Sequence, residues 1–319
     1  MPGATSGDFW PRVVVDEASF DFRELSDTDV EHALDQFNNE LGILLKGGQE
    51  PATYSDYYSV ECRDGVELWQ LLYERATDVD PDVCRLTSVL FDHCRKWDDD
   101  APAGCMPIDL PENPIPAFSV GYALAMGLRG RAVGCLVFPT CPRRGLMTLN
   151  AEPSAVEVVF FAAASEVHKI WRHAFTLENV SEHEFLVVAA FAFPSLIFHS
   201  DLRFGKFTGS YAVVRDPVVR ILCALNDHFP RVHAECMGLP DDVDAAMGQY
   251  GVNLSRESTK THSNKAAMRQ RDVTHKGFQY RCEWHAKIDG YRNRIHFTLP
   301  TDGPNGRILI GIFTSHLDV

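Results

Sequence analysis

Residues 278–314 read FQYRCEWHAKIDGYRNRIHFTLPTDGPNGRILIGIFT, and this stretch decides the fold of the C-terminal part of the chain. Three strand-like runs lie within it: Phe278–Ile288, Asn293–Leu299 and Arg307–Thr314. Alternation of apolar and polar residues along such runs is typical of strands with one buried face. The links between the runs, Asp289-Gly290 and Asp302–Gly306, are rich in turn-forming residues. The sequence predicts an antiparallel three-stranded meander packed on the preceding helices.

The first third of the chain is predicted to be helical. Ser26 is a candidate N-cap, and apolar residues then recur at helical spacing at Val30, Leu34, Phe37, Leu41 and Leu44. A second helix is expected over Val66–Arg75. A third is expected from Asp80-Pro81, a cap followed by a first-turn proline, to about Trp97.

The middle of the chain has a mixed pattern. Two segments rich in Val and Phe predict buried strands, Ala132–Pro139 and Val156–Ala162. Helices are expected at Ser165–Phe175, at Ser181–Phe193, from Asp216-Pro217 to about Phe229-Pro230, and at Asp241–Tyr250.

A proline-rich segment divides the chain. Asp98–Pro116 holds five prolines and three consecutive aspartates, which makes it the best linker candidate. We therefore expect an α+β protein with three parts: an acidic helical region at 1–110, a central α/β segment at 117–250, and a basic, histidine-rich β module at 253–319.

Composition limits the classes of function. The formal net charge of −14 over 319 residues argues against non-specific binding of the whole molecule to nucleic acid or membrane. The longest apolar run, Phe185–Phe198, contains Pro194 and is too short to span a bilayer. The nine cysteines form no CxxC pair, and the first twelve residues lack the layout of a signal peptide. These features predict a cytoplasmic protein with reduced thiols and no membrane partner.

The two signs of charge are segregated along the sequence. Residues 1–113 hold 25 acidic and 8 basic side chains, whereas residues 253–300 hold 10 basic and 4 acidic ones. A local basic field attracts phosphate whatever the average charge. Either both ends are ordinary solvated surfaces, or the acidic helices partner the basic module or dock another protein.

Strand alternation places four candidate catalytic residues together. If the apolar rows face inward, His285 and Lys287 of one strand share an open face with Arg294 and His296 of the next. Imidazoles transfer protons near neutral pH, and Lys and Arg hold phosphate, so this set suits metal-independent RNA cleavage. The alternative is that this face is an ordinary basic surface of the sheet, on which the histidines are merely solvated and have no catalytic role. Supporting nucleic-acid contacts are expected from Arg271, Arg281, Arg292 and His316.

Other constellations are weaker. Four possible zinc ligands, Cys223, His228, His233 and Cys236, have an unfamiliar spacing for a structural site. P-loop, GxGxxG and GxSxG motifs are missing from the sequence. We therefore expect neither a metal nor another cofactor.

The same C-terminal residues carry a resemblance. The string Trp284-His285-x-Lys287, then Asn293–Phe297, Ile310-Gly311-Ile312 and His316-Leu317, resembles the C-terminal signature of an uncharacterised bacterial family associated with defence or mobile elements. Ser255–Ser258, Arg269-x-Arg271 and Phe193–Leu196 are similar to upstream positions of that family. A helical lead-in before three strands bearing Arg, Lys and His also resembles, distantly, the RelE-type toxin ribonucleases, which implies cleavage of RNA restrained by a partner.

Three functions stay open at this point. The first is an endoribonuclease or toxin-like effector that acts through the C-terminal module. The second is a non-catalytic nucleic-acid-binding module that uses the same face. The third is an interaction subunit of a bacterial defence or regulatory complex, docked through its acidic helices.

Overall fold

A computed structural model of the chain describes residues 11–74, 76–101, 104–110, 113–151, 154–290 and 292–318. The first ten residues, on which the signal-peptide argument rests, lie outside this set. The chain is an α+β protein, as the sequence predicts. It divides into two compact units, Met1–Asn179 and Val180–Val319. The boundary falls inside the expected central segment, and the expected linker lies within the first unit.

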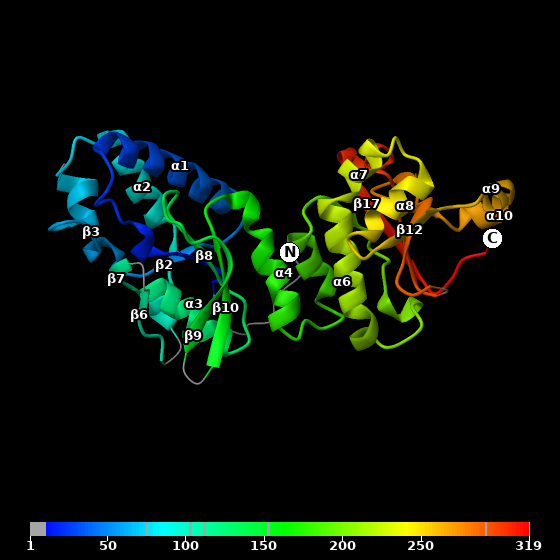
Figure 1. Cartoon of the computed structure of the whole chain (residues 1–319), viewed down its shortest axis with the longest axis horizontal. Helices are drawn as coiled ribbons and strands as arrows, with labels where there is room; N and C mark the ends of the chain where they lie inside the picture. The colour runs from blue at the N-terminus through cyan, green and yellow to red at the C-terminus, as the bar shows by residue number, and fades with distance from the viewer. Residues whose placement is uncertain are drawn as a thin grey trace. The chain divides into compact units, whose positions relative to one another are not determined.

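The first unit is built on a six-stranded sheet with the order β5-β2-β1-β8-β10-β9 (Figure 1). Its strands are β1 (Val13–Val15), β2 (Ala52–Thr53), β5 (Arg95–Lys96), β8 (Gly134–Leu136), β9 (Gly145–Ala151) and β10 (Ser154–Phe161). All neighbouring strands are parallel except the pair β9–β10. Small hairpins add β3 (Glu61–Arg63) with β4 (Val66–Glu67), and β6 (Ile108–Leu110) with β7 (Asn113–Ala117).

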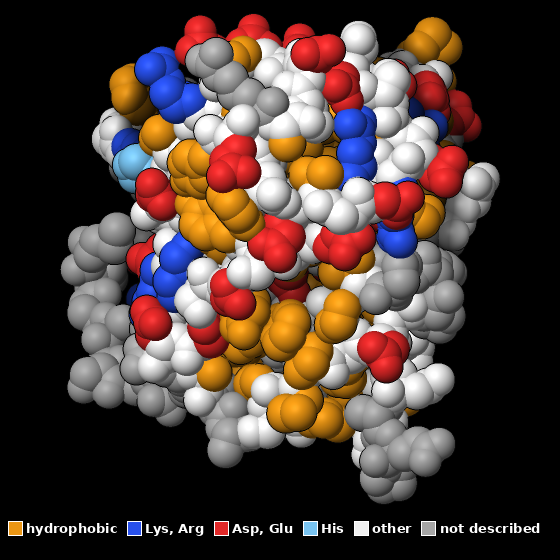
Figure 2. Space-filling view, turned by 90° about the vertical axis from the view of Figure 1, so that its left-hand side faces the viewer, with side chains coloured by type: hydrophobic (Ala, Val, Ile, Leu, Met, Phe, Trp, Pro, Cys, Tyr) orange, Lys and Arg blue, Asp and Glu red, His pale blue; other side chains and the backbone are white. Residues whose placement is uncertain are grey.

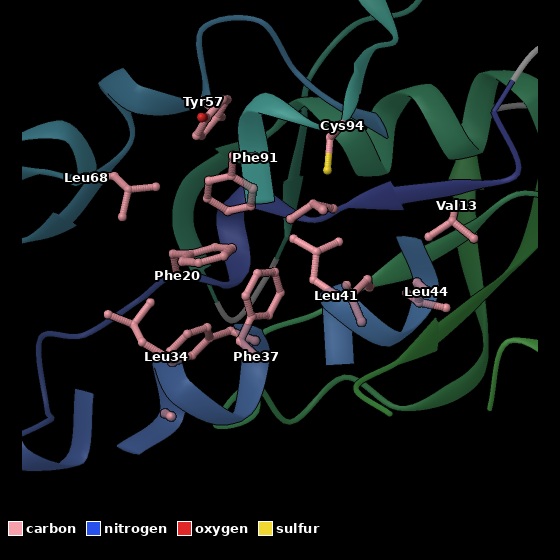
Figure 3. Close-up of a cluster of buried hydrophobic side chains, with 14 of the residues drawn as sticks. Val13, Phe20, Leu34, Phe37, Leu41, Leu44, Tyr57, Leu68, Phe91 and Cys94 are labelled. Carbon is pink, nitrogen blue, oxygen red and sulfur yellow. The ribbon is translucent and has the colours of Figure 1, made fainter. Parts of the chain in front are cut away.

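Helices cover both faces of this sheet. The helices of the unit are α1 (Asp27–Lys46), α2 (Pro81–Asp92), α3 (Phe118–Leu128) and α4 (His168–Leu177). Residues of α1, α2 and α4 join Val13 and Val15 in one core, part of which is drawn in Figure 3, whereas α3 joins Val14 in the other. A strand buried on both sides loses the alternating pattern and becomes continuously apolar. This explains why the sequence pattern indicated the helices of the N-terminal region but not the strands β1, β2 and β5 among them.

Helix caps in this unit were read correctly from the sequence. Ser26 Oγ accepts a hydrogen bond from the backbone N–H of Asp29, and α1 buries the predicted apolar stripe. Asp80 caps α2 and Pro81 occupies its first turn. The helix expected over Val66–Arg75 is shorter, because Val66 and Glu67 form β4.

Many acidic side chains of the first unit lie on its surface. Figure 2 shows the side on which β3 lies, with Asp and Glu side chains spread among apolar ones and few Lys or Arg between them. No helix in the described part of the chain has both the length and the apolar character needed to cross a membrane. The apolar run Phe185–Phe198 forms the short helix α5 (Phe185–Ala192) and the strand β11 (Leu196–Phe198).

The second unit contains the predicted meander. Its five-stranded sheet has the order β11-β17-β16-β15-β12 (Figure 1). The strands are β12 (Asn253–Arg256), β15 (Trp284–Lys287), β16 (Arg294–Phe297) and β17 (Ile308–Thr314), in addition to β11. The three expected strands pair antiparallel as β15–β16–β17. The first is shorter than expected, because Phe278–Arg281 forms a separate strand, β14, paired with β13 (Asp272–His275).

Helices pack on one face of this sheet. They are α6 (Tyr211–Asp227), α7 (Phe229–Glu235) and α8 (Pro240–Gly248). Two short helices, α9 (Thr259–Ser263) and α10 (Lys265–Arg269), belong to the segment between β12 and β15. Phe229 of α7 lies 5.7 Å from Trp284 and 5.1 Å from Phe297, measured between ring centres. The apolar row of the meander therefore faces the helices, as predicted. Pro217 lies inside α6 and not in its first turn, which corrects the expected start of that helix.

Candidate functional site

The four predicted catalytic residues lie on one face of the sheet. In the β15–β16 ladder His285 is opposite His296, and Lys287 is opposite Arg294. The two imidazole ring centres are 5.0 Å apart. Period-two alternation thus identified the shared face correctly.

The prediction that this face is open to solvent was wrong for the histidines. The exposed fraction of His285 is 5% and that of His296 is 0%. The segment between β12 and β15 covers them: Arg271 reaches Glu257, and Glu257 in turn contacts both imidazoles. A Cβ added to Gly311 of β17 would lie 2.3 Å from Cys282 Sγ, which shows how closely this segment approaches the sheet.

Arg271 corrects a second expectation. It was predicted to contact phosphate, but its side chain is fully buried. Its Nη2 donates a hydrogen bond to Glu257 Oε2 at 3.2 Å, and its Nη1 donates to the carbonyl of Ala267 at 2.8 Å. Arg271 therefore holds a carboxylate inside the protein.

Glu257 is the residue that the sequence argument missed. Its Oε1 atom lies 3.4 Å from His285 Nδ1 and 3.6 Å from His296 Nδ1. In the sequence it was counted only as one of a few acidic residues in a basic stretch. The available signal was its place directly after β12 and before Ser258, the N-cap of α9. We call Glu257, Arg271, His285 and His296 the buried histidine cluster.

Burial and charge fix the protonation of this cluster. Burial lowers the pKa of His296 to about 3, assisted by the neighbouring His285, and burial also lowers the pKa of His285. Burial alone would raise the pKa of Glu257, but its contacts with His285 and Arg271 outweigh this and bring it to about 2. At neutral pH the cluster contains an ionised carboxylate and two neutral imidazoles, which is the state in which these groups bind metals.

Of the predicted cations, Lys287 and Arg294 are half-buried, whereas Arg292 and His316 are exposed. Arg281 is exposed but forms an ion pair with Asp272 at 2.7 Å. Arg294 Nε is buried and has no hydrogen-bond partner among the described residues. His316 follows the end of β17, where Thr314 pairs with Arg294. Lys287, Arg294 and His316 thus belong to the same end of the sheet.

The cluster includes one group of metal-binding donors. One ligand atom from each of Glu257, His285 and His296 lies within 4.8 Å of the others, and this is the only such group found in the described part of the chain. The Cys/His set of the sequence analysis is not brought together in this way. His228 instead stacks on Tyr250 at 3.8 Å between ring centres.

The first unit has a buried charge cluster that the sequence argument did not identify. Asp16 and Glu17 directly follow β1, beside β8, where the strand order of the sheet reverses. Asp16 pairs with Arg143 at 2.7 Å, and Glu17 accepts a hydrogen bond from the backbone N–H of Ser119 at 2.9 Å. Ligands of open α/β sheets bind at such reversal points. These side chains are at most 5% exposed, however, so we assign them to the core.

Two cavities are lined by residues outside the two clusters. One of about 380 Å³ in the first unit is lined by residues that include Tyr54 and Phe118. One of about 510 Å³ in the second unit is lined by residues that include Leu186 and Phe204. Comparisons of the chain with protein-family models, with curated proteins and with solved structures found no match.

Proposed function

We propose that the second unit binds nucleic acid, RNA in particular, through the end of the sheet that carries Lys287 and Arg294. The observation that supports this is the pairing of two cations directly opposite each other on β15 and β16. Like charges in that position destabilise a sheet. Neither side chain forms an ion pair within the described residues. A bound phosphate would relieve this repulsion.

Further cations favour a polyanion over a single small anion. Three ion pairs in the unit, Arg256–Glu283, Arg271–Glu257 and Arg281–Asp272, use three of the acidic residues in the basic stretch. Within residues 253–300, the cations without such a pair among the described residues are Lys260, Lys265, Arg269, Lys276, Lys287, Arg292 and Arg294. Cations spread over several segments are typical of backbone contacts to nucleic acid.

We place binding ahead of cleavage because of the burial of the histidines. A general base must come within hydrogen-bond distance of the proton it abstracts. His296 is not exposed and His285 is 5% exposed, so neither imidazole presents itself to a ribose in this conformation. RNA cleavage by His285, Lys287, Arg294 and His296 therefore stays a prediction, and the test below includes it.

The proposed compartment is the cytoplasm. All nine cysteines are free thiols, and most of them are buried. Proteins of oxidising compartments commonly pair their cysteines.

The acidic surface of the first unit is the proposed contact for a protein partner.

The test is equilibrium binding of a fluorescent single-stranded RNA to the full chain over a range of salt concentrations. We expect salt-dependent binding, and we expect the double variant Lys287→Gln/Arg294→Gln to bind about tenfold or more weakly. Its plot of log affinity against log salt should be less steep by about one to two units. Arg231→Gln is the matched control, because Arg231 is an exposed arginine on α7 that pairs with Glu235.

Unchanged affinity in the double variant would contradict the proposal, as would the absence of any salt-dependent binding by the wild type. The same samples are analysed for RNA fragments on a gel. If the wild type cleaves the RNA, and His285→Gln binds the RNA without cleaving it, the ribonuclease function would be favoured over the non-catalytic binding module. A DNA of the same sequence tests the preference for RNA.

A further inference from the structure

We propose that Glu257, His285 and His296 form a binding site for one divalent transition-metal ion of the zinc type. The proposal goes beyond nucleic-acid binding, because it concerns the buried end of the face and not Lys287 and Arg294. The sequence argument assigned no metal to these residues. Their geometry and their unsatisfied polar atoms carry the inference.

The spacing of the donor atoms fits a coordination shell. Bonds of about 2.0–2.2 Å from zinc to nitrogen or oxygen give a tetrahedron with edges of about 3.3–3.6 Å. Glu257 Oε1 lies 3.4 Å from His285 Nδ1 and 3.6 Å from His296 Nδ1. These two distances match such an edge, and one donor atom from each of the three residues lies within 4.8 Å of the others. Three protein ligands leave a fourth position for water or another ligand.

Several polar atoms of the cluster lack a hydrogen bond, although Arg271 Nε lies 3.1 Å from Glu257 Oε1 as an ion pair. Glu257 Oε1, His285 Nδ1 and both ring nitrogens of His296 are buried and have no hydrogen-bond partner among the described residues. Hydrogen bonds from the two Nδ1 atoms to Oε1 would satisfy them, but 3.4 Å and 3.6 Å are beyond the usual range for such bonds. Unpaired buried groups are rare in folded proteins. One metal ion would satisfy the carboxylate and both imidazoles together.

Arg271 acts on the carboxylate from the other side. Its Nη2 donates a hydrogen bond to Oε2, and its Nε lies 3.1 Å from Oε1, the oxygen that also faces both imidazoles, so Arg271 fixes the position of the carboxylate. Hydrogen-bonded ligand carboxylates are common around protein metals. The positive charge of Arg271 opposes a cation, so we expect weaker affinity than in a structural zinc site with thiolate ligands.

The donor set indicates which metals fit. Two imidazoles and one carboxylate suit zinc, cobalt, iron(II) or manganese. Magnesium and calcium prefer shells of oxygen atoms alone. We therefore expect selective binding of transition metals over magnesium.

The test uses the full chain after removal of metals by a chelator, in the absence of nucleic acid. Titration with Co²⁺ should produce visible absorption bands that saturate at one equivalent, and Zn²⁺, but not Mg²⁺, should displace them. Zn²⁺ should also raise the melting temperature. Both readouts are independent of Lys287 and Arg294, so their failure would leave the nucleic-acid proposal standing.

Two variants locate the ion. His296→Leu removes one ligand, and Glu257→Gln removes the charge while it keeps the size and the hydrogen-bonding capacity toward Arg271. Each should weaken Co²⁺ binding at least tenfold, and circular dichroism at near-ultraviolet wavelengths shows whether the variant is folded. The matched controls are His262→Asn and Glu283→Gln, which alter a more exposed pair 3.8 Å apart in the same unit and should bind Co²⁺ like the wild type.

Absence of the Co²⁺ bands in the folded wild type would overturn the proposal. Unchanged affinity in folded Glu257→Gln or His296→Leu would overturn it as well, because the ion would then bind elsewhere. If His296→Leu does not fold, Glu257→Gln and the wild-type titration decide the question.

Discussion

Each unit of this protein buries charged side chains, but the two clusters differ in composition. In the first unit two adjacent carboxylates are buried: Asp16 forms an ion pair with Arg143, and Glu17 accepts a hydrogen bond from the backbone N–H of Ser119. In the second unit the single carboxylate of the buried histidine cluster, Glu257, forms an ion pair with Arg271 and lies beside two imidazoles. The ratio of carboxylates to guanidinium groups decides which of the buried groups is charged.

The pKa values follow from this difference. Burial raises the pKa of Glu17 to about 7, and the charge of Asp16 adds to the shift; burial also raises the pKa of Asp16 despite Arg143. In contrast, contacts with His285 and Arg271 hold the pKa of Glu257 at about 2 against burial. Burial thus favours the protonated form of Glu17 in the first cluster, whereas the second cluster contains a charged carboxylate beside two imidazoles. We therefore assign a stabilising role to the first and a binding site to the second.

Removal of the buried guanidinium of either cluster should have the largest effect on the free energy of unfolding. Arg271→Leu leaves an ionised, buried carboxylate, and we expect a loss of about 3–5 kcal/mol in the free energy of unfolding of the second unit. Arg143→Leu should cost the first unit less at pH 5 than at pH 8, because Asp16, whose pKa is raised, takes up a proton. Urea unfolding followed by peptide-resolved hydrogen exchange reports each unit separately.

The exposed Arg231 provides the control for both substitutions. Arg231→Leu should leave both units unchanged, since this side chain lies on the surface of α7. Equal losses for Arg143→Leu at the two pH values would contradict the assigned difference between the clusters. A loss for Arg271→Leu no larger than that for Arg231→Leu would contradict it too.

The second largest effect concerns Glu17 and pH. Its folded-state pKa of about 7 lies above the ordinary value of 4.5, so the folded state keeps a proton that the unfolded chain releases between these pH values. The stability of the first unit should therefore fall as pH rises through this window, by up to about 3 kcal/mol at 1.36 kcal/mol per pKa unit. Glu17→Gln should match the wild type near pH 4.5 and exceed it at pH 8.

Peptide-resolved unfolding at matched pH tests this, because any effect of pH on exchange itself cancels between variant and wild type. Glu24→Gln, at an exposed position of the same unit, should show no difference from wild type at either pH. If Glu17→Gln is not more stable than wild type at pH 8, the carboxyl does not retain its proton in the folded state.

Local sequence patterns predicted the parts of both units that depend on local rules. The caps at Ser26 and Asp80, the apolar stripe of α1 and the pairing of β15 with β16 all follow from spacing and alternation. The strands β2 and β5 have two residues each, which is too short for any period to be visible. The identity of the residues facing each other was therefore predictable for the meander but not for the parallel sheet.

The solvent exposure of the candidate site depends on a non-local contact. Alternation shows which side chains share a face, but it does not show what covers that face. The covering segment between β12 and β15 has its own hairpin, β13–β14, and looks in sequence like an extension of the meander. For the same reason Arg271 was expected on the surface. Glu257 was counted only as one of the few acidic residues of the basic stretch.

The smallest expected effect tests whether that segment covers the face. Gly311→Ala places a methyl group where Cys282 Sγ would be 2.3 Å away and Val273 3.3 Å away, so one of the two elements must shift. Overpacking of this kind costs about 1–3 kcal/mol, and hydrogen exchange should increase first in β13, β14 and around His285. Gly290→Ala is the control, because a Cβ there meets no atom within 4 Å. If Gly311→Ala proves as stable as Gly290→Ala, the segment does not lie against β17, and His285 and His296 would be open to solvent as the alternation alone suggested.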